Sequence, residues 1–292
     1  MGTRWARHRA SGVASAGVGT RSDIPGTAGG RPYHRAPVRF VTFDDGGRRR
    51  LGALLDGRVV DLPGLLGHPA FPTAMEHLVR RNGGTVLTAA RAALARPDAD
   101  AFAVDRARLL VPIVPASLRS PDATAGQRAL LGPDTVVPWP GEAAALDLRP
   151  KLVAVLRRPL AGARIESVAE AVFGYTLLID WRGVRDDGTL LPEDRVPVTL
   201  GPAITTPEDW EPMGALLRIL VDGARWVEGP LDGAVDRLVR DVATASRLAP
   251  LEAGDAFASL PLATGDRRVP EGSIVELSLE GLGDLRVEVG RR

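Results

Sequence analysis

Two cationic side chains stand close together in the segment LDLRPKLVAVL, which spans residues 146–156. Arg149 and Lys151 are two positions apart, so on an extended strand both side chains point to the same face. A pair of fixed cations can bind a carboxylate or stabilise an enolate, and a guanidinium grips a carboxylate through two hydrogen bonds. Lys151 is the only lysine in the chain, and a buried lysine beside an arginine can also act as a base or form a Schiff base. The pair is therefore a candidate site for an anion, and a catalytic role for Arg149 and Lys151 needs support from the rest of the sequence.

Composition narrows the classes of protein to consider. The chain has 292 residues, 45% of them hydrophobic, and a net charge of +1, so it can bury a large core and has no overall field that favours nucleic acid or an anionic membrane. The absence of cysteine excludes disulfides and thiolate nucleophiles, and the four histidines have no spacing that suits a metal. No apolar run approaches ~18 residues, so we expect no transmembrane helix and a cytoplasmic protein. The predominance of arginine over lysine, with abundant Ala, Gly and Pro, is typical of a GC-rich bacterial genome.

The elements that must position the two cations fall into two predicted domains. Residues 1–37 are basic and Gly-rich without an apolar stretch, which predicts a disordered extension. Residues 38–62 read as three short strands joined by turns, and apolar residues at helical spacing follow between 75 and 93. This pattern predicts a small α+β domain over residues 38–108.

The remainder, residues 109–292, is predicted to be a second, strand-rich domain. A strand is expected over 105–115, at the boundary, and alternating or wholly apolar runs separated by turns follow it. Helices are expected only over 167–172 and 230–249. Many strands with little β–α alternation predict a mixed, mainly β fold of the sandwich or roll type.

Five stretches share their order and spacing with the motifs of one known family. They are RLGALLDGRVVDL (50–62), GPDTVVPWP with LDLRPKLVAVL (132–156), EAVFGYTLLIDWRGVRD (170–186), GPAITTPEDW (201–210) and PEGSIVELSLEGLGDLRVEV (270–289). In this order the chain resembles the fumarylacetoacetate hydrolase family over residues 38–290. The resemblance implies a β-sandwich-like roll, a homodimer, and C–C hydrolysis or formation, decarboxylation or tautomerisation of a small oxo-acid or 1,3-dicarbonyl compound.

The same resemblance implies a metal site that this chain has altered. The family norm is Mg²⁺ or Mn²⁺, held by two glutamates of a Glu-x-Glu strand and by one aspartate. Asp180 matches the aspartate, whereas Arg149 and Lys151 stand where the two glutamates would be. One carboxylate does not hold Mg²⁺ against its hydration shell, and two cations repel it. We therefore expect the metal to be lost and the protein to use no cofactor.

Further site residues follow from the family's motifs. The catalytic histidine loop should fall within residues 117–128, where this chain has neither His nor Tyr. Arg182 and Arg185 follow Asp180, and the pair Thr264–Gly265 retains part of a late family loop. The resemblance predicts that these four residues bind substrate.

Three hypotheses about activity remain open. In the first, Arg149 and Lys151 supply the metal's charge beside Asp180 in a metal-free reaction, and an open pocket above them would favour it. In the second, the chain is a non-catalytic descendant, a binding protein or partner subunit, whose charged residues pair with one another in a closed site. In the third, other acids hold a metal. Those acids are Glu142, Asp147, Asp180 and Asp186.

Overall fold

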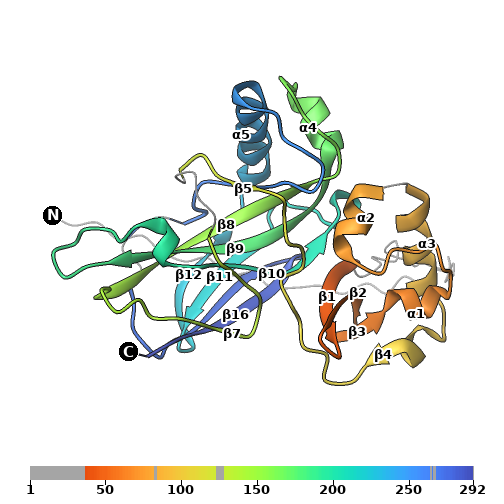
Figure 1. The fold of residues 1–292 in the computed structure, drawn as a ribbon, viewed down its shortest axis with the longest axis horizontal. Helices are drawn as coiled ribbons and strands as arrows, with labels where there is room; N and C mark the ends of the chain where they lie inside the picture. The colour runs from red at the N-terminus through yellow and green to blue at the C-terminus, as the bar shows by residue number, and fades with distance from the viewer. Residues whose placement is uncertain (1–36, 82–83, 123–127, 264, 266–267, 292) are drawn as a thin grey trace, which may run out of the picture. The chain divides into compact units, whose positions relative to one another are not determined.

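The computed structural model describes residues 37–81, 84–122, 128–263, 265 and 268–291 (Figure 1). They belong to one compact unit, Ala36–Arg292. The extension predicted over 1–37 lies, except for its last residue, outside the described part. Within that part, no helix is long and apolar enough to cross a membrane.

The predicted N-terminal meander is confirmed. Strands β1 (Arg39–Asp45), β2 (Arg48–Leu55) and β3 (Arg58–Asp61) pair antiparallel in sequence order. The turn between β2 and β3 is Asp56–Gly57, and both residues have positive φ (48° and 79°), as a tight hairpin requires.

Short helices cover this meander. They are α1 (Leu62–Leu66), α2 (Met75–Arg81) and α3 (Gly84–Leu94), followed by the 3₁₀ turn η1 (Ala99–Phe102) and strand β4 (Ala103–Val104). Met75 and Leu78 of α2 and Leu87 of α3 are buried in one cluster with Phe40 of β1, which confirms the predicted helical spacing.

The strand predicted over 105–115 is wrong. Leu109 alone makes a β-bridge there, to Phe43 of β1. Pro112 has no N–H to donate to a ladder, and Arg106 has a left-handed φ of 49°, so this stretch cannot keep a continuous strand.

Within the described residues, the larger sheet has 11 strands in the order β4-β3-β2-β1-β10-β9-β8-β13-β5, with β14 paired to β8 and β6 paired to β10. The strands not yet given are β5 (Leu118–Arg119), β6 (Leu130–Leu131), β8 (Ala145–Leu156), β9 (Val172–Val184), β10 (Val198–Thr205), β13 (Ala256–Ala258) and β14 (Arg268–Val269). β1 pairs antiparallel with β10, so the N-terminal meander continues the sheet that contains β8 and β9. The division into two domains at residue 108 stays a prediction.

A second sheet, of five strands in the described chain, has the order β12-β11-β15-β16-β7. Its strands are β7 (Thr135–Val137), β11 (Leu216–Val221), β12 (Ala224–Pro230), β15 (Ile274–Leu279) and β16 (Gly283–Val289). Leu148 of β8 and Trp181 of β9 share one buried cluster with Leu277 and Leu285 of this sheet. Two sheets with parallel and antiparallel pairs confirm the mixed, mainly β fold.

Helices are few in the C-terminal part, as predicted. α4 (Ile165–Ala171) and α5 (Ala234–Leu248) lie close to the two expected ranges, and η2 (Glu193–Arg195) and η3 (Pro207–Asp209) are single 3₁₀ turns. Leu238 and Val242 of α5 are buried in the cluster between the sheets, because its apolar residues recur at helical spacing.

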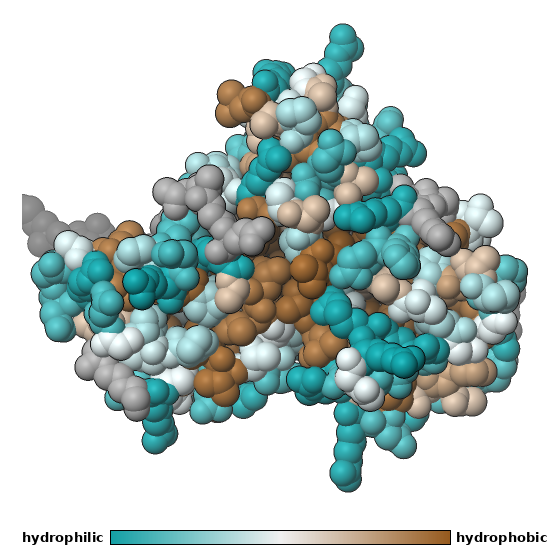
Figure 2. Space-filling model, viewed as in Figure 1, coloured by the Kyte–Doolittle hydropathy of each residue, from teal (hydrophilic) through white to brown (hydrophobic). Residues whose placement is uncertain are grey.

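One face of the molecule carries hydrophobic residues gathered near its middle, flanked by hydrophilic ones (Figure 2). Several large hydrophobic side chains of the described chain are exposed. They are Val114, Val136, Ile165, Leu190, Met213, Trp226, Leu248 and Leu260.

Candidate active site

The pairing of β8 with β9 brings the predicted site residues together. In this register Arg149 lies opposite Asp180, and Lys151 is two residues further along β8 on the same face. On the other face, Leu148 lies opposite Trp181, and both point into the core. The alternation that the sequence shows thus places the charged residues on one face of the sheet and the apolar ones on the other.

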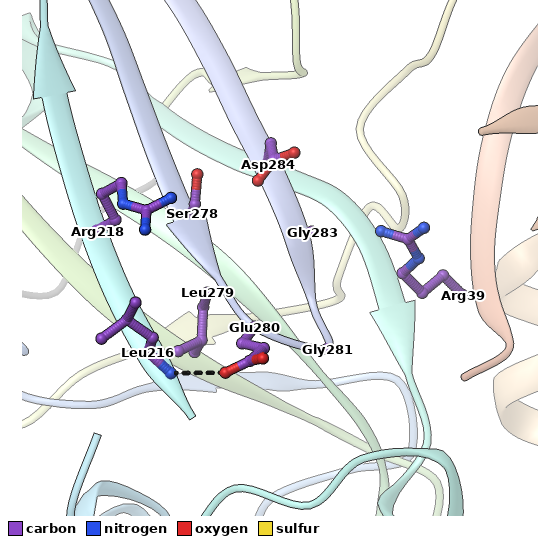
Figure 3. Close-up of a pocket in the computed structure, with 9 residues that line it drawn as sticks. All are labelled: Arg39, Leu216, Arg218, Ser278, Leu279, Glu280, Gly281, Gly283 and Asp284. Carbon is purple, nitrogen blue, oxygen red and sulfur yellow. Dashed lines mark hydrogen bonds between the residues drawn. The ribbon is translucent and has the colours of Figure 1, made fainter. Parts of the chain in front are cut away.

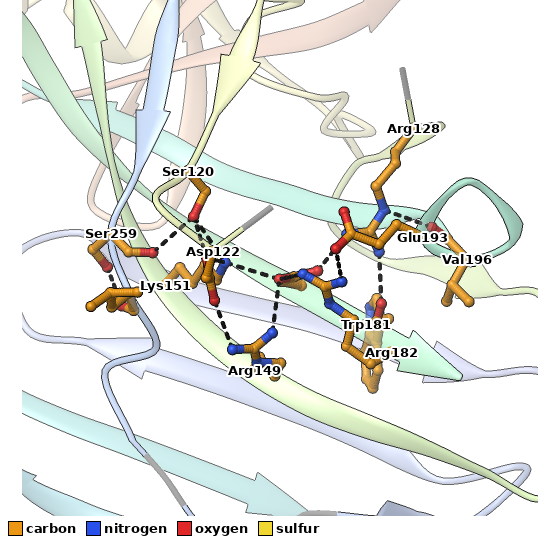
Figure 4. A network of polar contacts seen from close by, with 12 residues as sticks. Ser120, Asp122, Arg128, Arg149, Lys151, Trp181, Arg182, Glu193, Val196 and Ser259 are labelled. Carbon is orange, nitrogen blue, oxygen red and sulfur yellow. Dashed lines mark hydrogen bonds and ion pairs between the residues drawn. The ribbon is translucent and has the colours of Figure 1, made fainter. Parts of the chain in front are cut away.

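Lys151 has the least exposed side chain of the cations at this site, at 1%. Its Nζ donates to Asp122 Oδ1 at 2.6 Å and to Ser120 Oγ at 3.1 Å, and lies 2.9 Å from Asp180 Oδ2 (Figure 4). Two of the three N–H donors of the ammonium group are thus hydrogen-bonded, and the contact with Asp180 is an ion pair. Lys151 therefore links two carboxylates that come from different segments of the chain.

Asp122 joins Lys151 to Arg149. Its Oδ2 accepts a hydrogen bond from Arg149 Nη2 at 2.7 Å, while its Oδ1 also accepts one from Ser120 Oγ at 2.5 Å. Burial acts to raise the pKa of Asp122, but the hydrogen bonds from Lys151 and Ser120 and the nearby charges outweigh it and lower the pKa. The carboxylate is therefore ionised and held at two points by two cations.

Asp180 is the centre of the network. Besides Lys151, it pairs with Arg128, with Arg182 at 3.1 Å and with Arg149 at 3.9 Å. Burial acts to raise the pKa of Asp180, but the charges of Lys151, Arg128 and Arg182 outweigh it and lower the pKa to about 2. This carboxylate stays ionised at any pH near neutrality.

Two of these arginines are fixed by further partners. Arg128 donates to three backbone carbonyls, those of Trp181, Val196 and Pro197, at 2.6, 2.9 and 3.0 Å. Arg182 pairs with Glu193, and its buried Nε has no hydrogen-bond partner among the described residues.

The other predicted site residues lie elsewhere or outside the described chain. Arg185 donates to the carbonyl of Leu190 and pairs with Glu142 at 3.2 Å, so it faces away from the network. Gly265 is exposed, and Thr264 lies outside the described residues. Of the four residues predicted to bind substrate, Arg182 alone is seen in the network.

Sequence reasoning missed Ser120, Asp122, Arg128 and Glu193. The first three fall in the segment 117–128, where the family pattern predicts a histidine and no ion-pair network. The signal was present, because buried cations such as Lys151 need carboxylate partners. Asp122 is the only acid within the expected loop, residues 117–128.

The donor set around Asp180 does not fit a divalent cation. Mg²⁺ and Mn²⁺ take several oxygen ligands, whereas the side chains that contact Asp180 here are cations. Among the described residues no three His, Asp or Glu side chains form a group that could hold a metal. Of the alternative ligands, Glu142 pairs with Arg185, and Asp147 lies opposite Arg182 and Arg268 in the two neighbouring strands.

A pocket of about 320 Å³ lies apart from this network, along β11 and the β15–β16 hairpin (Figure 3). It is lined by Arg39, Leu216, Arg218, Ser278, Leu279, Glu280, Gly281, Gly283 and Asp284. None of the residues that contact Asp180 lines it. The pocket therefore does not open onto Arg149 or Lys151.

Solved structures with the same fold include a hydrolase and an isomerase. Maleylpyruvate hydrolase from Sphingobium sp. SYK-6 has a TM-score of 0.68 and 23% identity, over 87% of this chain and 100% of that chain. Its complex with manganese(II) and pyruvate has a TM-score of 0.64 and 22% identity, over 86% and 98%. 5-Carboxymethyl-2-hydroxymuconate delta-isomerase from Mycobacterium smegmatis has a TM-score of 0.63 and 20% identity, over 87% and 100%. At these identities the likeness shows the fold.

The sequence itself identifies the family. No curated protein matches the chain. Residues 114–290, which contain every residue of the network around Asp180, match the family model described as fumarylacetoacetate (FAA) hydrolase, C-terminal. The match covers more than half of the chain, and the chain belongs to the fumarylacetoacetate hydrolase family.

Proposed function

We propose that this chain acts on a small oxo-acid without a metal, and that the Lys151 ammonium stands in the place of the divalent cation. The observation that carries the proposal is the position of Lys151 Nζ, 2.6 Å from Asp122 and 2.9 Å from Asp180, at the strand position where the family pattern has a glutamate ligand. The names of similar structures, a maleylpyruvate hydrolase with bound pyruvate and a muconate isomerase, support an oxo-acid as the substrate class.

Arg149 is the group that faces the substrate. Its side chain is 27% exposed, against 1% for Lys151, and Arg149 contacts carboxylates through its two terminal nitrogens. A guanidinium at the rim of a buried cationic cluster binds the carboxylate of an oxo-acid and stabilises negative charge on the adjacent oxygen.

The charge state of the site favours one class of reaction. Asp180, with a pKa of about 2, is a weak base, and both oxygens of Asp122 accept hydrogen bonds from cations or a hydroxyl. Activation of water for C–C hydrolysis needs a base with a pKa nearer to neutrality. Decarboxylation needs only stabilisation of an enolate, which fixed cations supply.

The chemistry that fits is loss of CO₂ from a 2-oxo acid with a carboxylate on C3. The bond from C3 to that carboxylate breaks, CO₂ leaves, and the electron pair passes to the 2-oxo oxygen as an enolate beside Arg149. A proton from solvent then reaches C3. Tautomerisation of the same acids passes through a different enolate, which keeps the C3 carboxylate, and it needs a base to remove a proton from C3.

A second candidate, a non-catalytic oxo-acid-binding protein or partner subunit, is favoured by a different observation. The ammonium of Lys151 pairs with two carboxylates of the chain and its side chain is almost fully buried, as in a structural ion-pair cluster. Such a cluster needs no turnover.

The two candidates are separated by a turnover assay. Chelator-treated protein is incubated with 2-oxo acids that carry a C3 carboxylate, and substrate loss and CO₂ are followed. Metal-free decarboxylation predicts turnover that Arg149→Gln strongly reduces and Arg218→Gln leaves intact, since Arg218 lines the separate pocket and pairs with Glu228. Absence of turnover with retained binding supports the second candidate.

We also propose that the chain forms a homodimer, as the family resemblance implies. Exposed apolar side chains such as Val114 and Val136, at 52% and 55% exposure, are consistent with a protein–protein contact. Light scattering coupled to size exclusion tests this, and the mass of a single chain would refute it.

A further inference from the structure

The position of Asp122 resembles that of a bound ligand more than that of a structural partner. One carboxylate is held at two points, by Lys151 at 2.6 Å and by Arg149 at 2.7 Å. This is the grip that two fixed cations would make on the carboxylate of an oxo-acid. Asp122 thus already fills the place in which a substrate anion would be held.

Asp122 also differs from the other carboxylate that Lys151 contacts. Asp180 lies inside β9, paired on both sides by β8 and β10, and its side chain is only 3% exposed. Asp122 follows the two-residue strand β5, lies outside any strand, and is 19% exposed. The backbone of Asp122 is outside the sheet, so the whole residue can move away from the cations without breaking a sheet hydrogen bond, whereas the backbone of Asp180 is held between β8 and β10.

The charges in the network favour an incoming anion. It contains four cations and three carboxylates among the described residues. They are Arg128, Arg149, Lys151 and Arg182, with Asp122, Asp180 and Glu193. When Asp122 withdraws, the cluster is left with two uncompensated positive charges, which a dicarboxylate matches better than a monocarboxylate.

We propose that Asp122 is an internal carboxylate ligand of the substrate site, which a carboxylate of a small dicarboxylic oxo-acid displaces from Arg149 and Lys151. This inference rests on the proposed function, because it assigns the substrate's carboxylate to the same two cations. Asp122 lowers the affinity for weak anions by competing with them, and it selects acids that bring two negative charges.

The test measures binding and not turnover, with malonate as an unreactive dicarboxylate and acetate as a monocarboxylate. Isothermal titration calorimetry compares the wild type with Asp122→Asn, which removes the charge and keeps the size. The matched control is Asp209→Asn, because Asp209 also pairs with one arginine at 2.7 Å, Arg91, in a partly buried contact away from the site. We expect malonate to bind the Asp122→Asn variant about tenfold more tightly than wild type, and the control to bind as wild type does.

Equal or weaker malonate binding by a folded Asp122→Asn variant overturns the inference, because a purely structural partner of Lys151 gives that result. If the variant does not fold, the crystal structure of the wild type soaked in malonate tests whether malonate displaces Asp122. Malonate on Arg149 and Lys151 with Asp122 turned away supports displacement, and Asp122 still in place under saturating malonate refutes it. A protein that shows displacement but no turnover of any oxo-acid keeps this inference and loses the decarboxylation proposal, so the two failures are distinguishable.

Discussion

The ammonium of Lys151 lies 2.9 Å from the carboxylate of Asp180, and neither side chain is more than 3% exposed. The two residues stand on neighbouring strands of one sheet, β8 and β9, and Arg149 lies directly opposite Asp180 in the same ladder. A buried ion pair of this kind is costly to break from one side, because the remaining charge is left without compensation.

Replacement of Lys151 by methionine should therefore destabilise the fold. Methionine has a similar length and no charge, so it leaves Asp122 and Asp180 with fewer partners in a buried place. We expect a loss of about 3 kcal/mol in the free energy of unfolding, measured by urea denaturation. Arg218→Met, which breaks an exposed pair with Glu228, should change the stability much less, because solvent screens that pair. Equal stability of the Lys151→Met variant and the wild type would show that the pair contributes nothing.

The depressed pKa of Asp180 predicts a loss of stability in acid. Its folded pKa is about 2 and its unfolded pKa is near the ordinary value of 3.8, so its contribution is fully present above pH 4 to 5 and is lost as pH falls toward 2. The contribution is about 2 kcal/mol by linkage. Asp122, whose pKa is also lowered, acts in the same direction.

Unfolding free energies measured between pH 5 and pH 2 on the wild type and on Asp180→Asn test this dependence on pH. Near pH 3, midway between the two pKa values, the variant should take up close to one proton fewer on unfolding than the wild type. Identical pH slopes would mean that Asp180 is not held in the charged form by its cationic neighbours.

The shape of the Arg149 side chain should matter as much as its charge. Arg149→Lys keeps a positive charge but loses the planar fork that grips a carboxylate, so kcat/KM for the oxo-acid should fall about tenfold. Arg149→Gln also removes the charge and should lower it about a hundredfold. Steady-state kinetics on both variants measure the difference. A fully active Arg149→Gln variant would show that Arg149 does not bind the substrate.

The β9–β10 pairing that holds Asp180 in place depends on Gly174. A Cβ added there would lie 2.6 Å from the carbonyl oxygen of Thr205 in β10, so Gly174→Ala should cost about 2 kcal/mol of stability. Gly229 of β12 is a strand glycine with nothing within 4 Å of an added Cβ, and Gly229→Ala is the control. Thermal melting of both variants tests this prediction, which is wrong if the two variants have the same melting temperature.

The strand β8 and the placement of its two cations on one face were predictable from the sequence, because polar and apolar residues alternate along this segment. LDLRPKL places Leu148 and Arg149 on opposite faces, and the structure confirms this arrangement. The prediction of a strand over 105–115 was wrong because proline interrupts its apolar residues. Proline has no N–H to donate to a neighbouring strand, so a hydrophobic run that contains it does not form a continuous ladder.

The partners of the cations were not predictable in the same way. Asp122 and Arg128 belong to a segment far from β8 in sequence, and no local pattern specifies which acid reaches a buried lysine. The sequence also does not indicate which of two neighbouring arginines, Arg182 or Arg185, contacts the buried carboxylate. They are three residues apart on one segment, yet Arg182 enters the network and Arg185 pairs with Glu142.

The most direct test of whether Lys151 replaces the metal is a titration of chelator-treated protein with Mn²⁺. The electron paramagnetic resonance signal of the free ion measures how much Mn²⁺ remains unbound. With a cation at each of the family's two glutamate positions, the wild type and Asp180→Asn should leave the same amount of Mn²⁺ free. Removal of one Mn²⁺ per chain by the wild type, and not by Asp180→Asn, would contradict this and restore a metal to the site.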